Sequence, residues 1–209
     1  TSVYCFDNMM DNEGKANYDS AVINGIWFDF DHNTDVGICL KDIRKFIRQY
    51  CIPRSITPRI YLTGGKGFQM NIDFQSQLEI SDSQKRQALR EYLTHLKETY
   101  KLKTLDQACI NNSVACLRRI PNTQYISKIT GEPTGVWCIP VSVDEAMSLS
   151  IEEIYGLAME PREKHVIVKS GRAQRDMIDY LCDKAGIKHT ISNSGDYLLY
   201  QPWSPAGSL

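Results

Sequence analysis

The sequence predicts an α+β fold. Its apolar segments show the spacing of strands in some places and of helices in others, without the regular alternation of a doubly wound parallel sheet. Two short strand-like segments, 59–63 and 68–74, are joined by a glycine turn, which indicates a hairpin or two strands linked by a glycine loop. The chain has 209 residues, 42% hydrophobic and 23% charged, the profile of a folded protein.

The first half of the chain is expected to form a strand, a helix and the hairpin. The apolar run from Ala21 predicts a strand that ends at Asp31. Residues 32–35 have the composition of a turn and offer helix-capping side chains. Apolar residues at helical spacing then predict a helix over 36–50, followed by a loop bracketed by two prolines.

The second half begins with a long helix, capped by Ser81 and Asp82. Its predicted apolar face carries Leu89, Tyr92, Leu93 and Leu96. Residues 107–135 are rich in Asn, Pro, Thr and Gly and carry the pair Arg118 and Arg119 in the middle. We expect a strand over 135–141, and a helix that starts with a capping box at 142–145. The tail predicts a strand over 165–169, a helix over about 171–185 and a hairpin over 187–200 that turns at 192–195.

Charge and cysteine usage restrict the function classes. The formal net charge of −1 gives no bulk signal for a nucleic-acid partner, so such a partner would need a local basic surface. No apolar run approaches the roughly 18 residues needed to cross a bilayer. The seven cysteines are scattered, without a CxxC pair. This pattern favours reduced, buried thiols in a cytoplasmic protein over a disulfide framework or a zinc site.

The pair Asp29 and Asp31 is the first candidate for chemistry. On a strand, residues two apart point to the same face, so the two carboxylates lie side by side while Phe28 and Phe30 face a core. Adjacent like charges repel unless a cation lies between them, and magnesium prefers oxygen ligands. The alternative is a pair of surface acids at the end of a strand.

The second candidate is the glycine-rich segment from Thr63 to Gln69. Its glycines allow the backbone to approach an anion, Lys66 adds positive charge, and the flanking Thr and Gln add hydrogen-bond donors. The spacing is not that of a Walker motif. A simple glycine hairpin with a solvated lysine is the alternative.

The third candidate combines Asp106 with the later basic residues Arg118, Arg119 and Lys128. A third carboxylate could complete the ligand set for one or two ions, and an arginine could grip a triphosphate with its planar fork. The two arginines could equally be ordinary surface residues.

In this order, four segments resemble the motifs of the archaeo-eukaryotic primases: 28–31, 61–69, 105–106 and 118–123. The superfamily includes the primase small subunit, the primase-polymerases of plasmids and phages, and the polymerase domain of bacterial end-joining ligases. Residues 136–145 are similar to the strand-into-helix segment that follows in the family. The resemblance covers about residues 22–147.

The resemblance implies a catalytic core with an RRM-like antiparallel sheet and a second small α/β layer. It implies template-dependent joining of nucleotides to a 3′-hydroxyl, with Mg²⁺ or Mn²⁺ bound by Asp29, Asp31 and Asp106. The nucleotide phosphates would be bound by Thr63, Gly65, Lys66, Gly67, Gln69 and Arg119, with Arg118 as the rival of Arg119 and Lys128 as a further contact. Gln69 departs from the family, in which a histidine usually stands at this position.

The implied organisation is a core over residues 1–160 and a C-terminal α/β segment over 161–209 that packs on it. The chain begins at Thr1 rather than Met, so we expect a fragment of a longer replication protein. By the same resemblance, a helicase module in the same polypeptide is an expected partner. The expected partners are nucleoside triphosphates and a single-stranded or primed DNA template, in the host cytoplasm for a phage or plasmid protein. No membrane partner is expected.

Template binding would use basic residues beyond the motifs. Arg44 and Arg48 share a helix face through their i, i+4 spacing, and Arg54 follows in the next loop. A solvated helix face explains the same pattern. Further basic residues lie at 41, 45 and 59 and in the tail.

Two other function classes stay open. A metal-dependent nuclease would also use paired acids, but it has no need of a triphosphate cradle. A non-catalytic nucleotide- or DNA-binding module of a replication protein would fit the Gln69 departure. An assay with labelled nucleotide distinguishes these classes, because only a polymerase incorporates the nucleotide on a primed template.

Overall fold

The computed structural model describes residues 4–7, 10–74, 82–162, 164–168, 188–191 and 197–201. The chain divides into two compact units, Thr1–Glu160 and Pro161–Leu209, which are described separately. The first unit combines helices with antiparallel sheets, and the second contains an antiparallel sheet. The predicted α+β class is therefore confirmed.

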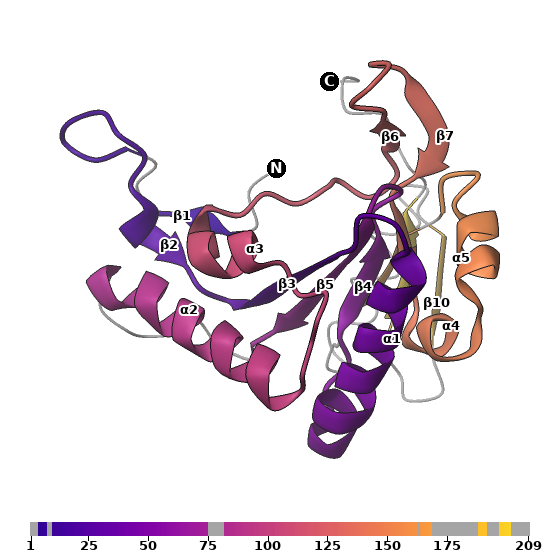
Figure 1. The fold of residues 1–209 in the computed structure, drawn as a ribbon, viewed down its shortest axis with the longest axis horizontal. Coiled ribbons are helices and arrows are strands. Elements are labelled where there is room, and N and C mark those ends of the chain that lie inside the picture. The colour runs from indigo at the N-terminus through magenta and orange to yellow at the C-terminus, as the bar shows by residue number, and fades with distance from the viewer. Residues whose placement is uncertain are drawn as a thin grey trace. The chain divides into compact units, whose positions relative to one another are not determined.

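The centre of the first unit is a four-stranded antiparallel sheet in the order β3-β5-β4-β8 (Figure 1). Its strands are β3 (Gly25–Asp31), β5 (Gly67–Asp73), β4 (Arg59–Leu62) and β8 (Ile139–Val141). β4 and β5 form the predicted hairpin, and β5 pairs with β3 along its whole length. β8 is an edge strand, which explains why it tolerates Pro140, a residue without a backbone donor.

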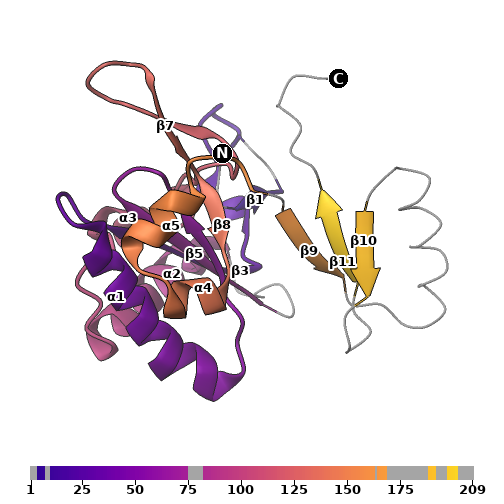
Figure 2. The same ribbon diagram turned by 90° about the vertical axis from the view of Figure 1, so that its right-hand side faces the viewer.

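One face of this sheet forms the main core. Its large side chains alternate with residues of the other face, as the strand period requires. The core is covered by helix α1 (Val36–Phe46) and by Leu93 and Leu96 of helix α2 (Asp82–Thr99). Helices α4 (Val143–Ser148) and α5 (Ile151–Leu157) contact α1 (Figures 1 and 2). The fully buried members include Phe28, Phe30, Phe46, Phe68, Ile60, Leu62 and Met70.

Local capping explains where the helices begin. The Asp35 side chain accepts a hydrogen bond from the Gly37 amide at 2.8 Å, so the predicted helix starts at Val36. Its last turns widen into a π-helical segment, η2 (Ile47–Cys51), and end in the 3₁₀ turn η3 (Ile52–Arg54). α4 begins with the predicted capping box, and α5 begins with another, Ser150 with Glu153, that the sequence analysis did not use.

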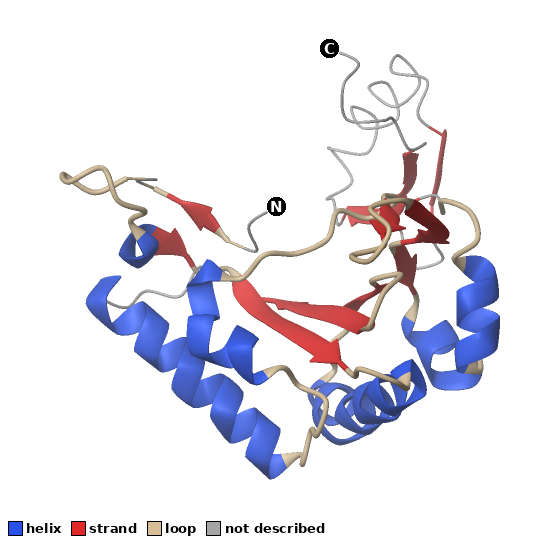
Figure 3. Ribbon diagram, turned by 45° about the horizontal axis from the view of Figure 1, so that its top comes forward, coloured by secondary structure: helices blue, strands red, loops and turns tan. Residues whose placement is uncertain are grey.

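The other face of the sheet contacts the part of the chain that follows α2 (Figure 3), since Cys109 and Cys116 pack with Trp27 and Tyr61. Helix α2 (Asp82–Thr99) is followed by α3 (Gln107–Asn112) and the 3₁₀ turn η4 (Ser113–Ala115). The chain then runs past β5, where the Arg119 amide bonds Gln69, to the vicinity of Cys138. This connection leads into a separate hairpin of β6 (Gln124–Ile126) and β7 (Pro133–Trp137).

Three expectations about the elements need correction. The predicted strand over 135–141 is two strands in different sheets, broken at Cys138, which exchanges backbone hydrogen bonds with residues 122 and 123. The predicted strand from Ala21 to Asp31 is likewise two strands in different sheets, β2 (Ala21–Val22) and β3. The region 107–135 contains α3, η4, β6 and the start of β7. Tyr92 lies at the edge of the apolar face of α2 and is 39% exposed, with its hydroxyl 2.9 Å from that of Tyr50.

The remaining elements lie at the ends of the chain. Near the start, β1 (Cys5–Phe6) pairs with β2 (Ala21–Val22), which follows the 3₁₀ turn η1 (Tyr18–Ser20). In the second unit, β9 (Lys164–Val168), β10 (Lys188–Ile191) and β11 (Tyr197–Gln201) form a sheet in the order β10-β11-β9 (Figure 2).

The tail prediction is tested only in part. The antiparallel pairing of β10 with β11 agrees with the predicted hairpin. The predicted helix at about 171–185, the turn at 192–195 and the cap at Ser81 lie outside the described residues. The packing of 161–209 on the core stays a prediction. Among the described helices, none is long and apolar enough to span a membrane.

Candidate active site

Two of the predicted metal ligands, Asp29 and Asp31, lie on β3 and face away from the core. Phe28 and Phe30 alternate with them and are fully buried on the opposite face, as the strand period predicts. Asp29 is partly buried and Asp31 is exposed. The end of β3 therefore presents two neighbouring acids at the surface of the unit.

The third predicted ligand, Asp106, reaches the same place through a short segment that runs antiparallel to β3. Phe30 and Leu105 form an isolated β-bridge, and the Asp106 amide donates to the Asp29 carbonyl at 2.8 Å. Leu105 is buried, so Asp106, the next residue, lies on the face that carries the other two acids. Asp106 also caps α3, since its Oδ1 accepts a hydrogen bond from the Ala108 amide at 3.0 Å.

The three acids interact electrostatically. Burial, reinforced by the charges of Asp31 and Asp106, raises the pKa of Asp29 to about 7, although a hydrogen bond with Gln69 acts in the opposite direction. Burial and the charge of Asp106 also raise the pKa of Asp31, whereas Lys66 and Lys128 lower it. Clustered carboxyl groups of this kind are stabilised by a cation.

One atom points directly to a missing partner. Oδ1 of Asp29 is buried and has no hydrogen-bond partner among the described residues. A buried carboxylate oxygen without a donor is costly, and a hard divalent cation would satisfy it. In the described part of the chain, no three His, Cys, Asp or Glu side chains are grouped so that they could hold a metal ion by themselves. The unpartnered oxygen of Asp29 and the acids near it fit a magnesium-type site, which typically uses few protein carboxylates together with substrate phosphates and water.

Gln69 occupies a different position from that of a nucleotide ligand. It lies opposite Asp29 in the β3–β5 register and is only 4% exposed. Its Oε1 accepts a hydrogen bond from the Arg119 amide at 3.1 Å, and its side chain is close enough to the Asp29 carboxylate to lower the pKa of Asp29. Gln69 therefore links the first acid to the arginine segment, and its polar groups are used inside the protein.

The glycine loop is a tight turn held by its own atoms. The Thr63 hydroxyl is buried and donates to the Gly67 carbonyl at 2.9 Å. A Cβ on Gly67 would lie 1.7 Å from the Phe30 carbonyl oxygen, so only glycine allows β5 to pass this close to β3. Thr63 and Gly67 thus shape the loop, whereas Lys66 is exposed at its tip.

A cleft of about 480 Å³ opens at the end of β3. It brings Asp31 and Asp106 together with Lys66, as the sequence analysis expected for acids and the phosphate loop. His32 and Asn33 complete the lining, and Asn33 accepts a hydrogen bond from Lys66 at 3.2 Å. From the sequence, these two residues are expected only to form a turn. Their position directly after the paired acids was the available signal.

The structure distinguishes the two arginines. The Arg119 guanidinium lies 4.5 Å from the centre of the Tyr125 ring, and that ring packs against Gly65 of the glycine loop. Arg118 lies instead over Trp27, at 5.7 Å, near the middle of β3. Arg119 is therefore the arginine associated with the loop. Lys128, on the β6–β7 hairpin, is close enough to Asp31 to influence its pKa.

The residues predicted to bind DNA lie away from the cleft. Arg44 donates to the carbonyls of Ala146, at 2.6 Å, and of Leu149, so it ties α1 to the end of α4. Arg48 is exposed, and Arg54 packs over the ring of Tyr50. Because a helix rises 1.5 Å per residue, Arg48 lies about 20 Å along the helix from its start near the cleft.

The cysteines cluster more than their spacing in the sequence indicates. Cys109, Cys116 and Cys138 form a small buried group with Trp27 and Tyr61 on the polar side of the sheet. The sulfur atoms of Cys109 and Cys116 are 3.0 Å apart. Cys5 is exposed, in contrast to the other described cysteines, which are buried free thiols.

Comparisons with known proteins do not identify the chain: no protein-family model, no curated protein and no solved structure matches it.

Proposed function

We propose that the protein is a template-dependent nucleotidyltransferase, a primase-polymerase that joins nucleotides to a 3′-hydroxyl. The observation that carries the proposal is a cleft of about 480 Å³ lined by Asp31, Asp106 and Lys66, with Asp29 close enough to both acids for their charges to raise its pKa. Paired acids alone would also suit a nuclease, but the adjacent loop and Lys66 add the positive charge that a triphosphate needs. The resemblance of the ordered motifs to archaeo-eukaryotic primases, with an RRM-like sheet, supports the same proposal.

The chain's own residues divide the work. Asp29, Asp31 and Asp106 hold the divalent ions, Mg²⁺ or Mn²⁺, which when bound stabilise charge on the attacking and leaving oxygens. Lys66 neutralises the triphosphate from the loop, and Arg119, which lies over the Tyr125 ring that packs against Gly65, adds further positive charge. Gln69 holds the Asp29 carboxylate in position rather than contacting the nucleotide.

The same proposal includes a single-stranded or primed DNA template as partner. Lys128 extends the basic surface next to the acids, while Arg48 and Arg54 would require a template that follows α1 away from the cleft. A helicase module in the same polypeptide and a cytoplasmic location also belong to the proposal, and they rest on the family resemblance alone.

A primer-extension assay with labelled nucleotides, in Mg²⁺ and in Mn²⁺, tests the proposal. Asp31→Asn should reduce incorporation by about 100-fold or more, because it removes a carboxylate ligand without changing the shape of the side chain. Asp73→Asn is the matched control, since Asp73 ends a strand of the same sheet in an exposed ion pair with Arg59. It should stay within about two-fold of the wild type.

Three results would contradict the proposal. Incorporation by Asp31→Asn at the wild-type rate would remove the metal role of the acids. Shortening of the template without incorporation would indicate a nuclease. Metal-dependent nucleotide binding without incorporation on any template would indicate a binding module.

A further inference from the structure

We infer that Asp42 is a positioning residue for the site, because its carboxylate holds the segment that presents Asp106. This inference rests on the metal role proposed for Asp106. Asp42 lies on α1, far from the motifs in the sequence, and the residues that line the cleft do not include it. We therefore expect Asp42 to act on the cleft through the segment that it holds.

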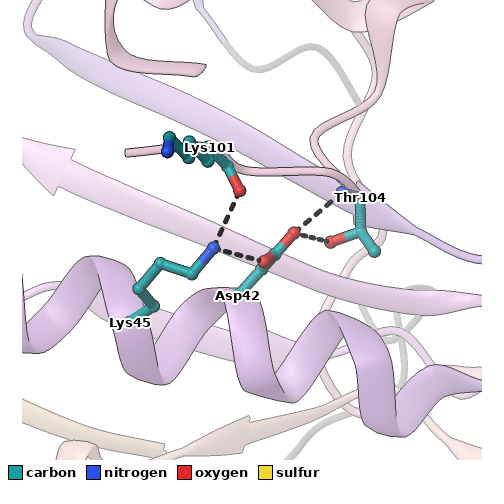
Figure 4. A network of polar contacts seen from close by, with 4 residues as sticks. All are labelled: Asp42, Lys45, Lys101 and Thr104. Carbon is teal, nitrogen blue, oxygen red and sulfur yellow. Dashed lines mark hydrogen bonds and ion pairs between the residues drawn. The ribbon is translucent and has the colours of Figure 1, made fainter. Parts of the chain in front are cut away.

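The contacts of Asp42 are specific to that segment (Figure 4). Its Oδ2 accepts hydrogen bonds from both the amide and the hydroxyl of Thr104, at 2.8 and 3.0 Å. Its Oδ1 accepts a hydrogen bond from Lys45 Nζ at 3.1 Å, and the same ammonium group donates to the Lys101 carbonyl at 2.8 Å. One buried acid thus anchors the chain at two points just before Asp106.

The segment needs such an anchor because its pairing with β3 is minimal. It forms an isolated bridge, flanked by the bond from the Asp31 amide to the Thr104 carbonyl, at 2.9 Å, and by the bond from the Asp106 amide to β3. A shift of one residue in a strand exchanges its two faces. Such a shift would turn Asp106 toward the core and Leu105 toward the acids, so the register of this segment decides whether the third carboxylate reaches the site.

Asp42 is suited to fix this register. It is 5% exposed, and its carboxylate is satisfied by the donors of Thr104 and Lys45. Hydrogen bonds to a buried ionised group are stronger than those between neutral groups, and losing them leaves a buried charge without partners. On the other side of the segment, Lys97 of α2 donates to the Leu105 carbonyl at 2.7 Å, so α1 and α2 hold it together.

The test measures Mn²⁺ affinity by electron paramagnetic resonance on the whole chain, without nucleotide or DNA. Asp42→Asn, which cannot accept both Thr104 bonds and the lysine bond as a carboxylate does, should weaken Mn²⁺ binding by about 10-fold. Thr104→Val removes only the hydroxyl donor and should weaken binding less. Thr104→Ser keeps both the amide and the hydroxyl donor, so its Mn²⁺ affinity should equal that of the wild type. Amide exchange at residues 104 and 106 should be faster in Asp42→Asn, because the Thr104 amide loses its carboxylate acceptor and the bond from the Asp106 amide to the Asp29 carbonyl is then held less firmly.

The control for general destabilisation is Tyr92→Phe, which removes the hydroxyl contact with Tyr50 and lies away from the acids. It should leave Mn²⁺ affinity unchanged. If Asp106→Asn loses Mn²⁺ affinity but folded Asp42→Asn and Thr104→Val both retain it, the inference is overturned while the proposed function stands. If Asp106→Asn itself binds Mn²⁺ like the wild type, the metal role of Asp106 fails, and the inference fails with it.

Discussion

Asp29 and Phe30 are neighbours in the sequence and opposites in their surroundings. Phe30 is completely buried in the main core, among aromatic and aliphatic side chains. Asp29, on the other face of the same strand, keeps a buried carboxylate oxygen without a partner and interacts with two further acids. The core face of the sheet stabilises the fold, whereas the clustered acids on the other face destabilise it unless a cation binds there.

The largest expected effect lies on the core face. Phe30→Ala should lower the free energy of unfolding by about 3 to 5 kcal/mol, because the cavity left in a packed core cannot fully collapse. Urea denaturation measures the change. The matched control is Ile129→Ala, at a residue that is 96% exposed, which should change stability by less than about 0.5 kcal/mol. A small effect of Phe30→Ala would mean that this face is not the main core.

Asp29→Asn, one residue away, should instead raise the free energy of unfolding. The pKa of Asp29 in the folded protein, about 7, lies above that of an unfolded chain, so this group favours folding at acid pH and loses that contribution as the pH rises through 7. The asparagine variant avoids this loss. In EDTA at pH 8 it should be more stable than the wild type by on the order of 2 kcal/mol, and the difference should disappear near pH 4. Urea denaturation at both pH values checks this, and a difference that does not depend on pH would contradict it.

A smaller effect is expected for the residue that bridges the acids and the arginine segment. Gln69→Met keeps the size of the side chain but leaves the Arg119 amide without its acceptor. The loss should be about 1 kcal/mol of stability, together with faster exchange of the Arg119 amide in NMR. Unchanged exchange at that amide would show that the bridge does not hold the segment, and would return Gln69 to the role of a nucleotide ligand.

Local signals predicted much of the central sheet and its helices. The period-two alternation of β3, the glycine turn of the β4–β5 hairpin, and the caps at Asp35 and Ser142 all act within a few residues, so they are readable along the chain. The candidate acids followed from the same alternation. The break at Cys138 could not be predicted from local alternation, because it depends on hydrogen bonds with residues 122 and 123, some fifteen positions away in the sequence.

The sequence alone determined that Asp29 and Asp31 share a face and that a lysine lies on a tight glycine loop, since both follow from backbone geometry over a few residues. Only the tertiary structure decided that Asp106 joins them, that Gln69 turns inward, and that Asp42 anchors the segment before Asp106. These depend on which distant segments pack together, and that choice is made by burial across the whole unit rather than by any local pattern.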